Sequence, residues 1–167
     1  MSWLSRPHPL ALMGLLGLFI PVTHEAALRI RRHLTNARPR PDVADLRYGP
    51  FDRNVLDLWK PSADRVRDGR PAPLVIFFHG GGFLGGDKSS VPPWLVRRCL
   101  AEGIAVASAN YRFSRQSPYP GPMLDGARAV QFVRRNAQSL EIDPGRIAAC
   151  GNSAGAGIAL WVGFHDD

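Results

Sequence analysis

Cysteine is scarce in this sequence, because only Cys99 and Cys150 occur among its 167 residues. Each lies in an apolar stretch, and their spacing matches neither a disulfide framework nor a zinc site. We therefore exclude both kinds of scaffold, expect no metal ion, and predict that the two thiols are small buried apolar groups.

Long hydrophobic runs are also missing. The N-terminal run at residues 10–22 has 13 residues, whereas a helix that crosses a bilayer needs about 20. Following Arg6, it suits the apolar part of a secretory signal, although Ala26 and Ala27 do not form a clean cleavage pattern. We predict a signal peptide over residues 1–27 and a secreted or periplasmic protein. The alternatives are an uncleaved N-terminal anchor, which would be the chain's membrane contact, and an amphipathic helix on a cytoplasmic protein.

Aromatic residues are missing from the most basic part of the chain. Arg and Lys outnumber Asp and Glu by 21 to 14, and seven arginines precede residue 48. A nucleic-acid-binding surface interleaves basic and aromatic residues on one face, but residues 29–33 read RIRRH. We exclude nucleic acid as a partner and predict a solvated basic linker over residues 28–42, before a folded domain at 43–167.

The apolar content that is present suffices for one folded domain. Hydrophobic residues make up 45% of the chain and charged residues 21%, which excludes disordered and coiled-coil classes. A chain of 167 residues is long enough for one core and too short for two.

Apolar runs and amphipathic segments alternate from residue 73 onward. Uninterrupted apolar runs predict buried strands at 73–79, 104–109 and 146–150. Helices are predicted from a cap at Ser89 or Ser90 to Gly103, over 123–140 and over 154–164. This order predicts an α/β fold with a parallel sheet, preceded by an antiparallel hairpin of strands 45–49 and 55–59. The polar residues predicted for the solvent face of the second helix are Asp125, Arg128, Gln131, Arg134 and Arg135.

The clearest chemical signal is the sequence GNSAG at residues 151–155. It matches G-x-S-x-G between a predicted buried strand and a predicted helix, which is the setting that this motif requires. Because so tight a turn excludes bulky neighbours, the Ser153 hydroxyl is presented at the carboxyl edge of the sheet. The helix N-terminus there favours developing negative charge. We predict that Ser153 is a nucleophile, with a purely structural glycine turn as the alternative.

A second glycine cluster, HGGGF at residues 79–83, follows the first predicted buried strand. Acyl transfer creates an oxyanion, which needs N–H donors held about 3 Å away. Consecutive glycines allow the backbone to turn such groups inward. We predict the amides of Gly81, Gly82 and Ala154 as these donors, with a flexible loop as the alternative.

The same glycines also satisfy the dinucleotide-binding pattern G-x-G-x-x-G, at Gly80, Gly82 and Gly85. Two features argue against a nucleotide. Pro92 and Pro93 prevent a helix from running through that point out of the glycines. The next strand is followed by Asn110, without the carboxylate that would hold a ribose.

These segments together resemble the α/β-hydrolase superfamily, in particular the hormone-sensitive-lipase-like and feruloyl-esterase-like (BD-FAE) carboxylesterases. The resemblance covers about residues 43–167. It implies the N-terminal part of an α/β-hydrolase fold, with a mostly parallel sheet, flanking helices and an initial hairpin. It also implies a serine esterase or lipase that forms an acyl-enzyme at Ser153 on a small-molecule ester, without a cofactor, and a loop-shaping role for His79. Asn110 departs from the pattern, because many relatives carry Asp there. The segments that carry the resemblance are HGGGF, NYR at 110–112, PYP at 118–120, IDPGRI at 142–147 and GNSAGAG at 151–157.

The triad acid and base of that superfamily are absent from this chain. Their order is Ser, then Asp or Glu, then His, but only His165, Asp166 and Asp167 follow Ser153 as candidates. Twelve helical residues place His165 roughly 18 Å from Ser153, whereas a base must lie within about 3 Å. We therefore interpret the sequence as the N-terminal portion of a longer hydrolase. The alternative is a catalytically inactive fragment or binding remnant.

Four further residues are candidates for lining a substrate pocket, although core packing is the favoured role for each: Leu84, Trp94, Phe113 and Tyr119.

Overall fold

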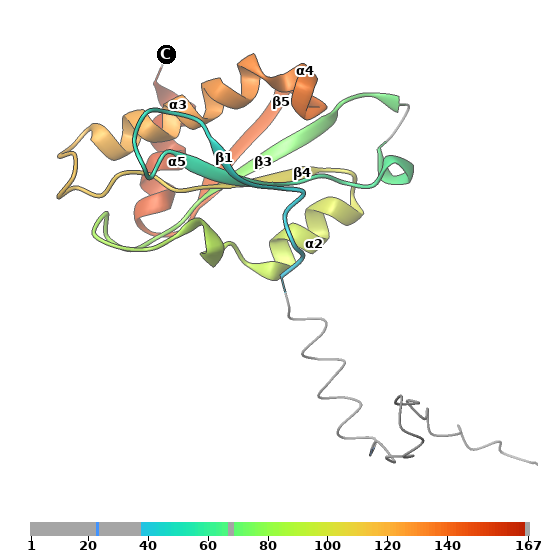
Figure 1. Cartoon of the computed structure of the whole chain (residues 1–167), viewed down its shortest axis with the longest axis horizontal. Coiled ribbons are helices and arrows are strands. Elements are labelled where there is room, and N and C mark those ends of the chain that lie inside the picture. Colours follow the sequence, from blue (N-terminus) through green and yellow to red (C-terminus); the bar gives the residue numbers. More distant parts are fainter. Residues whose placement is uncertain (1–22, 24–37, 67–68, 166–167) are drawn as a thin grey trace, which may run out of the picture. The chain divides into compact units, whose positions relative to one another are not determined.

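The structure is a computed structural model that describes residue 23 and residues 38–66 and 69–165 (Figure 1). The predicted signal segment and most of the predicted basic linker therefore lie outside the described residues. Every helix in the described ranges falls short of the length and apolar character that a bilayer span requires.

A five-stranded sheet forms the centre of the domain, in the spatial order β1-β2-β4-β3-β5. The predicted hairpin is present, because β1 (Val43–Arg47) and β2 (Val55–Trp59) pair antiparallel. β2 also pairs antiparallel with β4 (Ala105–Ala109). β3 (Ala72–Phe78) lies between β4 and β5 (Ile142–Gly151) and runs parallel to both. The predicted partial α/β-hydrolase architecture is confirmed.

The register brings three loops together at one edge of the sheet. Phe78 is the pairing partner of Ala109 in β4 and of Gly151 in β5. The carboxyl ends of the three parallel strands are therefore level. The glycine loop after β3 and the serine turn after β5 consequently begin side by side.

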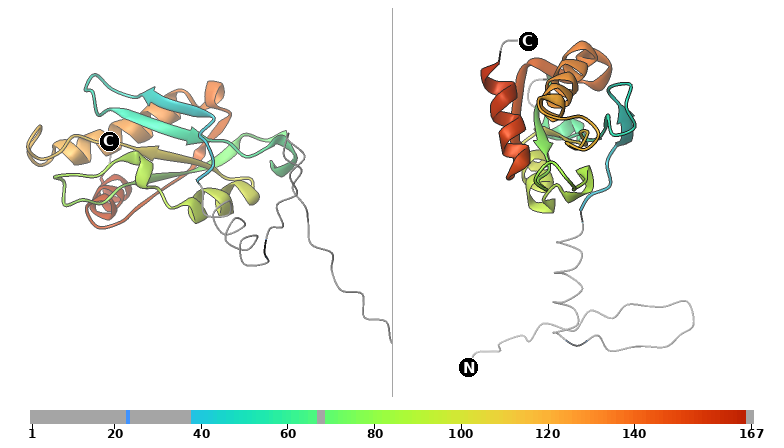
Figure 2. Two further views of the ribbon diagram at one scale, coloured as in Figure 1. Left: turned by 60° about the horizontal axis from the view of Figure 1, so that its bottom comes forward. Right: turned by 90° about the vertical axis from the view of Figure 1, so that its left-hand side faces the viewer.

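Helices cover both faces of the sheet (Figure 2). On one face, Leu74, Ile76 and Phe78 pack in a cluster with residues of α3 (Gly121–Arg135) and α5 (Ala154–Phe164). On the other face, Phe77 packs with Val96 of α2 (Pro93–Ala101). Alternate side chains of β3 thus enter two different cores, which explains why its sequence is apolar without interruption. The remaining elements are the short helices η1 (Ala63–Arg65), η3 (Lys88–Ser90) and α4 (Ala137–Leu140).

The helix boundaries differ from the prediction at two places. The predicted helix over 123–140 is divided at Asn136 into α3 and α4. The predicted cap at Ser89 or Ser90 is wrong, because α2 starts after Pro92. Ser89 and Ser90 belong instead to η3, in which the Asp87 side chain accepts a hydrogen bond from the Ser89 amide.

β5 is less buried than the sequence predicts. Within the described residues, β5 pairs only with β3, so its other edge has no strand beside it. Arg146 and Ala148 are exposed, and Cys150 is half-buried rather than buried. The prediction of a buried thiol holds for Cys99 alone.

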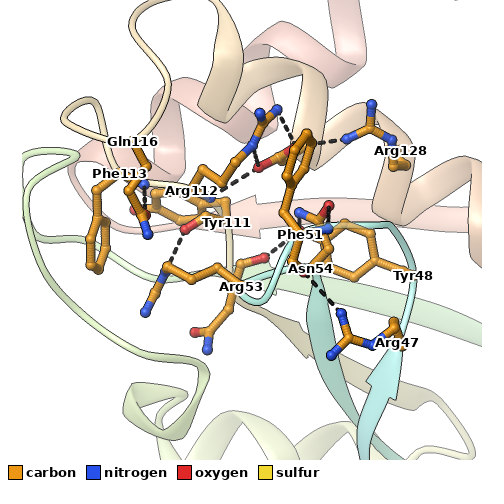
Figure 3. A network of polar contacts seen from close by, with 12 residues as sticks. Arg47, Tyr48, Phe51, Arg53, Asn54, Tyr111, Arg112, Phe113, Gln116 and Arg128 are labelled. Atoms are coloured by element: carbon orange, nitrogen blue, oxygen red, sulfur yellow. Dashed lines mark hydrogen bonds and ion pairs between the residues drawn. The ribbon is translucent and has the colours of Figure 1, made fainter.

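Asp125 also corrects the prediction, because it lies fully buried rather than on the solvent face of α3. Its carboxylate accepts two hydrogen bonds from the Arg112 guanidinium, each 2.8 Å long, and one of 2.8 Å from Arg128 (Figure 3). A carboxylate is buried at low cost only when it is paired in this way. The network joins α3 to the segment that follows β4.

Candidate active site

Ser153 occupies the predicted tight turn between β5 and α5. Its backbone has φ 50° and ψ −119°, outside the regions that are open to residues with a side chain. Such a conformation costs about 1–3 kcal/mol and persists only where the surrounding structure imposes it. The residue is exposed at the edge of the sheet, and its hydroxyl makes no hydrogen bond to another described residue.

The glycines on either side of Ser153 impose this conformation. A Cβ atom on Gly151 would lie 2.5 Å from the carbonyl carbon of Gly155 and 2.6 Å from the Phe78 oxygen. A Cβ atom on Gly155 would lie 2.0 Å from the same Phe78 oxygen. The turn therefore packs directly against the end of β3 and has no room for a side chain at either position.

The glycine loop after β3, which we call the oxyanion loop (residues 79–86), packs against the serine turn. A Cβ atom on Gly80 would lie 3.0 Å from the carbonyl oxygen of Asn152. The loop then turns sharply, with Gly81 at φ 125° and Gly82 at φ 60°. The amides of Leu84 and Gly85 donate back to the Gly81 carbonyl, at 3.0 and 3.1 Å.

Three amides at this place are without a protein acceptor. Within the described part of the chain, the N–H groups of Gly81, Gly82 and Ala154 donate no hydrogen bond. An amide without an acceptor is costly unless water or a ligand accepts from it. The three predicted oxyanion donors therefore lie in two adjoining backbone segments and are free to bind an anionic oxygen.

His79 opens the oxyanion loop and is held on both ring nitrogens. Nδ1 lies 2.7 Å from the Gly80 carbonyl oxygen, and Nε2 lies 3.2 Å from Nη2 of Arg53. The ring stacks on Tyr111 at 4.3 Å, and the Tyr111 hydroxyl donates to the His79 carbonyl at 2.6 Å. Burial, helped by the charge of Arg53, lowers the pKa of His79, although the bond to Gly80 opposes this shift. Both ring nitrogens of His79 are thus engaged within or beside the loop, which fits the loop-shaping role that the resemblance implies.

His165 lies at the far end of α5 from Ser153. It follows the last helical residue, and its ring stacks on Trp161 with 3.5 Å between the ring centres. This position agrees with the prediction that His165 is not the base. No histidine or carboxylate among the described residues hydrogen-bonds to the Ser153 hydroxyl.

A carboxylate supports the end of the oxyanion loop. Asp87 accepts hydrogen bonds from the Asn110 side-chain amide at 2.9 Å and from the Ser89 amide at 2.8 Å. Partial burial disfavours its ionised form, but these hydrogen bonds outweigh burial and lower the pKa of Asp87 to about 2. The side-chain amide of Asn110 is thus a donor to this carboxylate.

The lowered pKa of Asp87 predicts a specific dependence of stability on pH. Its contribution is fully present above the ordinary pKa near 4 and is lost as the pH falls towards 2. Because solvent screens this partly exposed group, we expect Asp87→Asn to lower the free energy of unfolding by about 1 kcal/mol at pH 6. The difference from wild type should shrink below pH 4, as measured by urea unfolding.

The control for this comparison is Asp52→Asn, in the exposed turn between β1 and β2. We expect it to change stability by less than about 0.5 kcal/mol at either pH. A loss in Asp87→Asn that is the same at pH 6 and pH 3 would contradict the assignment.

The sequence analysis favoured core packing for the four candidate pocket residues, but none of them packs in the core. Leu84, Trp94 and Tyr119 are 57%, 68% and 69% exposed. Phe113 is half-buried and covers the guanidinium of Arg53, 3.8 Å from its ring centre. Arg53 is the residue at this site that the sequence analysis missed. Nothing local distinguishes it from the other arginines, because its contacts lie 26 and 33 residues further along the chain.

Comparison with known proteins agrees with this geometry. The BD-FAE family profile matches residues 56–167. Two curated relatives from Mycobacterium tuberculosis are the esterase LipI, 35% identical over 114 residues, and the carboxylesterase NlhH, 36% identical over 111 residues. They match 68% and 66% of this chain. The chain spans 34% and 33% of their respective lengths.

A solved structure of Thermogutta terrifontis esterase 2, phosphonylated by cyclosarin, is similar in fold. The TM-score is 0.60 and the sequence identity is 26%. The match covers 72% of this chain and 47% of that chain.

Proposed function

Because the chain belongs to the BD-FAE family of α/β-hydrolases, we propose that it acts in the hydrolysis of carboxylic esters, with Ser153 as the nucleophile. One observation carries the proposal: Ser153 lies in a strained turn beside three amides that have no acceptor among the described residues. The names of the relatives, an esterase and a carboxylesterase, support the same substrate class.

The reaction follows from these positions. The Ser153 oxygen forms a bond to the ester carbonyl carbon and gives up its proton, while the carbonyl oxygen becomes an oxyanion. The amides of Gly81, Gly82 and Ala154 stabilise that charge. The bond to the alkoxy group then breaks, the alcohol leaves with a proton, and an acyl-serine remains. Water attacks the acyl-serine and releases the acid, which restores the hydroxyl.

The proton transfers need a histidine and a carboxylate, which we propose are supplied by polypeptide outside these 167 residues. Two features of the surface support this proposal. β5 has an unpaired edge within the described residues. α5 is apolar on all sides, the pattern of a helix that is covered by other elements, yet Leu160 and Phe164 are exposed. The indole N–H of Trp161 on the same helix is buried without a partner among the described residues.

A fluorophosphonate probe tests the proposed nucleophile. We expect the folded chain to be labelled at Ser153, slowly because a complete triad is lacking, and Ser153→Ala to remain unlabelled. The measurement is the mass of the labelled peptide as a function of time. Wild-type protein unfolded in urea should lose the reaction, since the oxyanion donors are then dispersed.

The matched control is Ser139→Ala on α4, whose hydroxyl donates to the Asn136 carbonyl. It should be labelled at the wild-type rate. If native and unfolded wild type react equally slowly, Ser153 is not activated. The alternative would then apply, a catalytically inactive fragment or binding remnant.

A further inference from the structure

We propose that Arg53 is a positioning residue for the oxyanion loop, whose two ends it holds together so that the amides of Gly81 and Gly82 keep their direction. Its chemical consequence rests on the proposed function, whereas its contacts do not. Arg53 lies in the turn between β1 and β2, and β4 separates that hairpin from β3.

One guanidinium makes three contacts with two other segments, and Figure 3 shows the one to Tyr111. Nη2 donates to the Gly86 carbonyl at 3.0 Å and lies 3.2 Å from His79 Nε2. Nε donates to the Tyr111 carbonyl at 2.7 Å. Nη2 thus touches the first residue of the loop and the last, while Nε anchors the group on the segment after β4.

The hydrogen-bond partners of His79 determine which of its two ring nitrogens carries the hydrogen. The Gly80 carbonyl only accepts, so Nδ1 carries the hydrogen. A guanidinium only donates, so Nε2 must be the acceptor towards Arg53. The aromatic ring of Phe113 lies over the guanidinium, with its centre 3.8 Å from Cζ. Arg53 therefore selects the neutral tautomer in which His79 can also bond to Gly80.

The remainder of the loop depends on this closure. A Cβ atom on Gly86 would lie 2.3 Å from the Gly80 oxygen, so the two ends touch. The tip is held separately by the Ser114 amide, which donates to Phe83 at 2.8 Å. Gly81 and Gly82 lie between these two attachments, and their own N–H groups have no acceptor in the part of the chain that the structure describes. The Gly81 N–H shares a peptide group with the Gly80 carbonyl, which is bonded to His79 Nδ1, so its direction depends on the His79 tautomer that Arg53 selects. The Gly82 N–H shares a peptide group with the Gly81 carbonyl, which accepts from Leu84 and Gly85 within the loop that Arg53 closes.

Arg53→Met is the principal test, performed on the full chain. Methionine keeps the apolar stem of the side chain but removes the guanidinium group and with it every donor. We expect fluorophosphonate labelling of Ser153 to slow by about 10- to 100-fold, because misplaced oxyanion donors lose most of their effect. The ring ¹⁵N signals of His79, assigned by their loss in His79→Asn, should show Nε2 released from its hydrogen bond and the ring titrating at a higher pH.

Two controls separate positioning from general damage. Methylguanidinium at millimolar concentration should restore both the labelling rate and the His79 signals in Arg53→Met, whereas methylammonium should not. Arg47→Met removes a neighbouring arginine of the hairpin, and it should match wild type. Among the described residues, the Arg47 side chain hydrogen-bonds only to the Phe51 carbonyl. If Arg53→Met does not fold, Arg53→Lys replaces it. That variant keeps the charge but loses the three-point contact, so slower labelling and changed His79 signals are expected.

The outcomes distinguish the two proposals. Wild-type labelling in Arg53→Met, or His79 signals that do not change, would overturn the positioning role. A lost rate that methylguanidinium does not restore would overturn it as well. If the wild type itself does not react with the probe, the proposed function fails. The His79 signals and the amide signals of Gly81 and Gly82 then still decide whether Arg53 closes the loop.

Discussion

Gly155→Ala is expected to prevent the chain from folding, or to lower its free energy of unfolding by more than about 3 kcal/mol. The added Cβ would lie 2.0 Å from the Phe78 carbonyl oxygen and 2.6 Å from that of His79. Both are backbone atoms at the carboxyl end of β3, so neither can move without displacing the strand or the oxyanion loop. Urea unfolding followed by far-UV circular dichroism measures the loss.

Gly157→Ala, two residues further along α5, is the matched control. A Cβ there would meet the Phe83 ring at 3.8 Å and the end of Met123 at 4.0 Å, which are ordinary contact distances. Because alanine is the better helix former, we expect this variant to be unchanged or more stable by up to about 1 kcal/mol. Equal stabilities for the two variants would show that the serine turn does not pack against β3 as described.

Asp125→Asn is expected to have the second largest effect, a loss of about 3 kcal/mol. The carboxylate is completely buried and binds both Arg112 and Arg128. Removing its charge leaves the Arg112 side chain, which is 15% exposed, without a counterion. Leaving one partner of a buried pair unpaired costs more than the pair itself contributes. The free energy of unfolding at neutral pH is the quantity to compare.

Asp143→Asn provides the comparison for a surface pair. Asp143 contacts Arg146 at 2.6 Å, but both side chains are substantially exposed. We expect less than about 1 kcal/mol from its loss. If the two Asp→Asn variants were equally stable, the network around Asp125 would contribute no more than a solvated ion pair does.

The elements that the sequence predicted correctly are those decided by local patterns. The hairpin, the parallel strands β3 and β4 and the helix α5 follow from apolar periodicity and from turn residues. The tight turn at Ser153 follows from the size of its neighbours, because only glycine fits at 151 and 155. Each of these features leaves a local sequence pattern, although the contact that requires glycine at 151 and 155 is made with the distant Phe78.

The features that were missed depend on residues that are distant in the sequence. Asp125 has a polar side chain on a helix, and only its contact with Arg112, 13 residues earlier, shows why it is buried. β5 has the composition of a central strand, but its exposure depends on what lies beside it. Arg53 was overlooked for the same reason, since its partners His79 and Gly86 belong to another loop.

The backbone at Ser153 has a consequence for how such a chain evolves. A glycine at that position would adopt φ 50° without strain, so replacing Ser153 by glycine would raise the free energy of unfolding of the domain. Selection for stability alone therefore acts against the serine hydroxyl. Only selection for catalytic activity preserves a serine there. In a lineage without that selection, we expect glycine to replace it and to give a more stable but inactive protein.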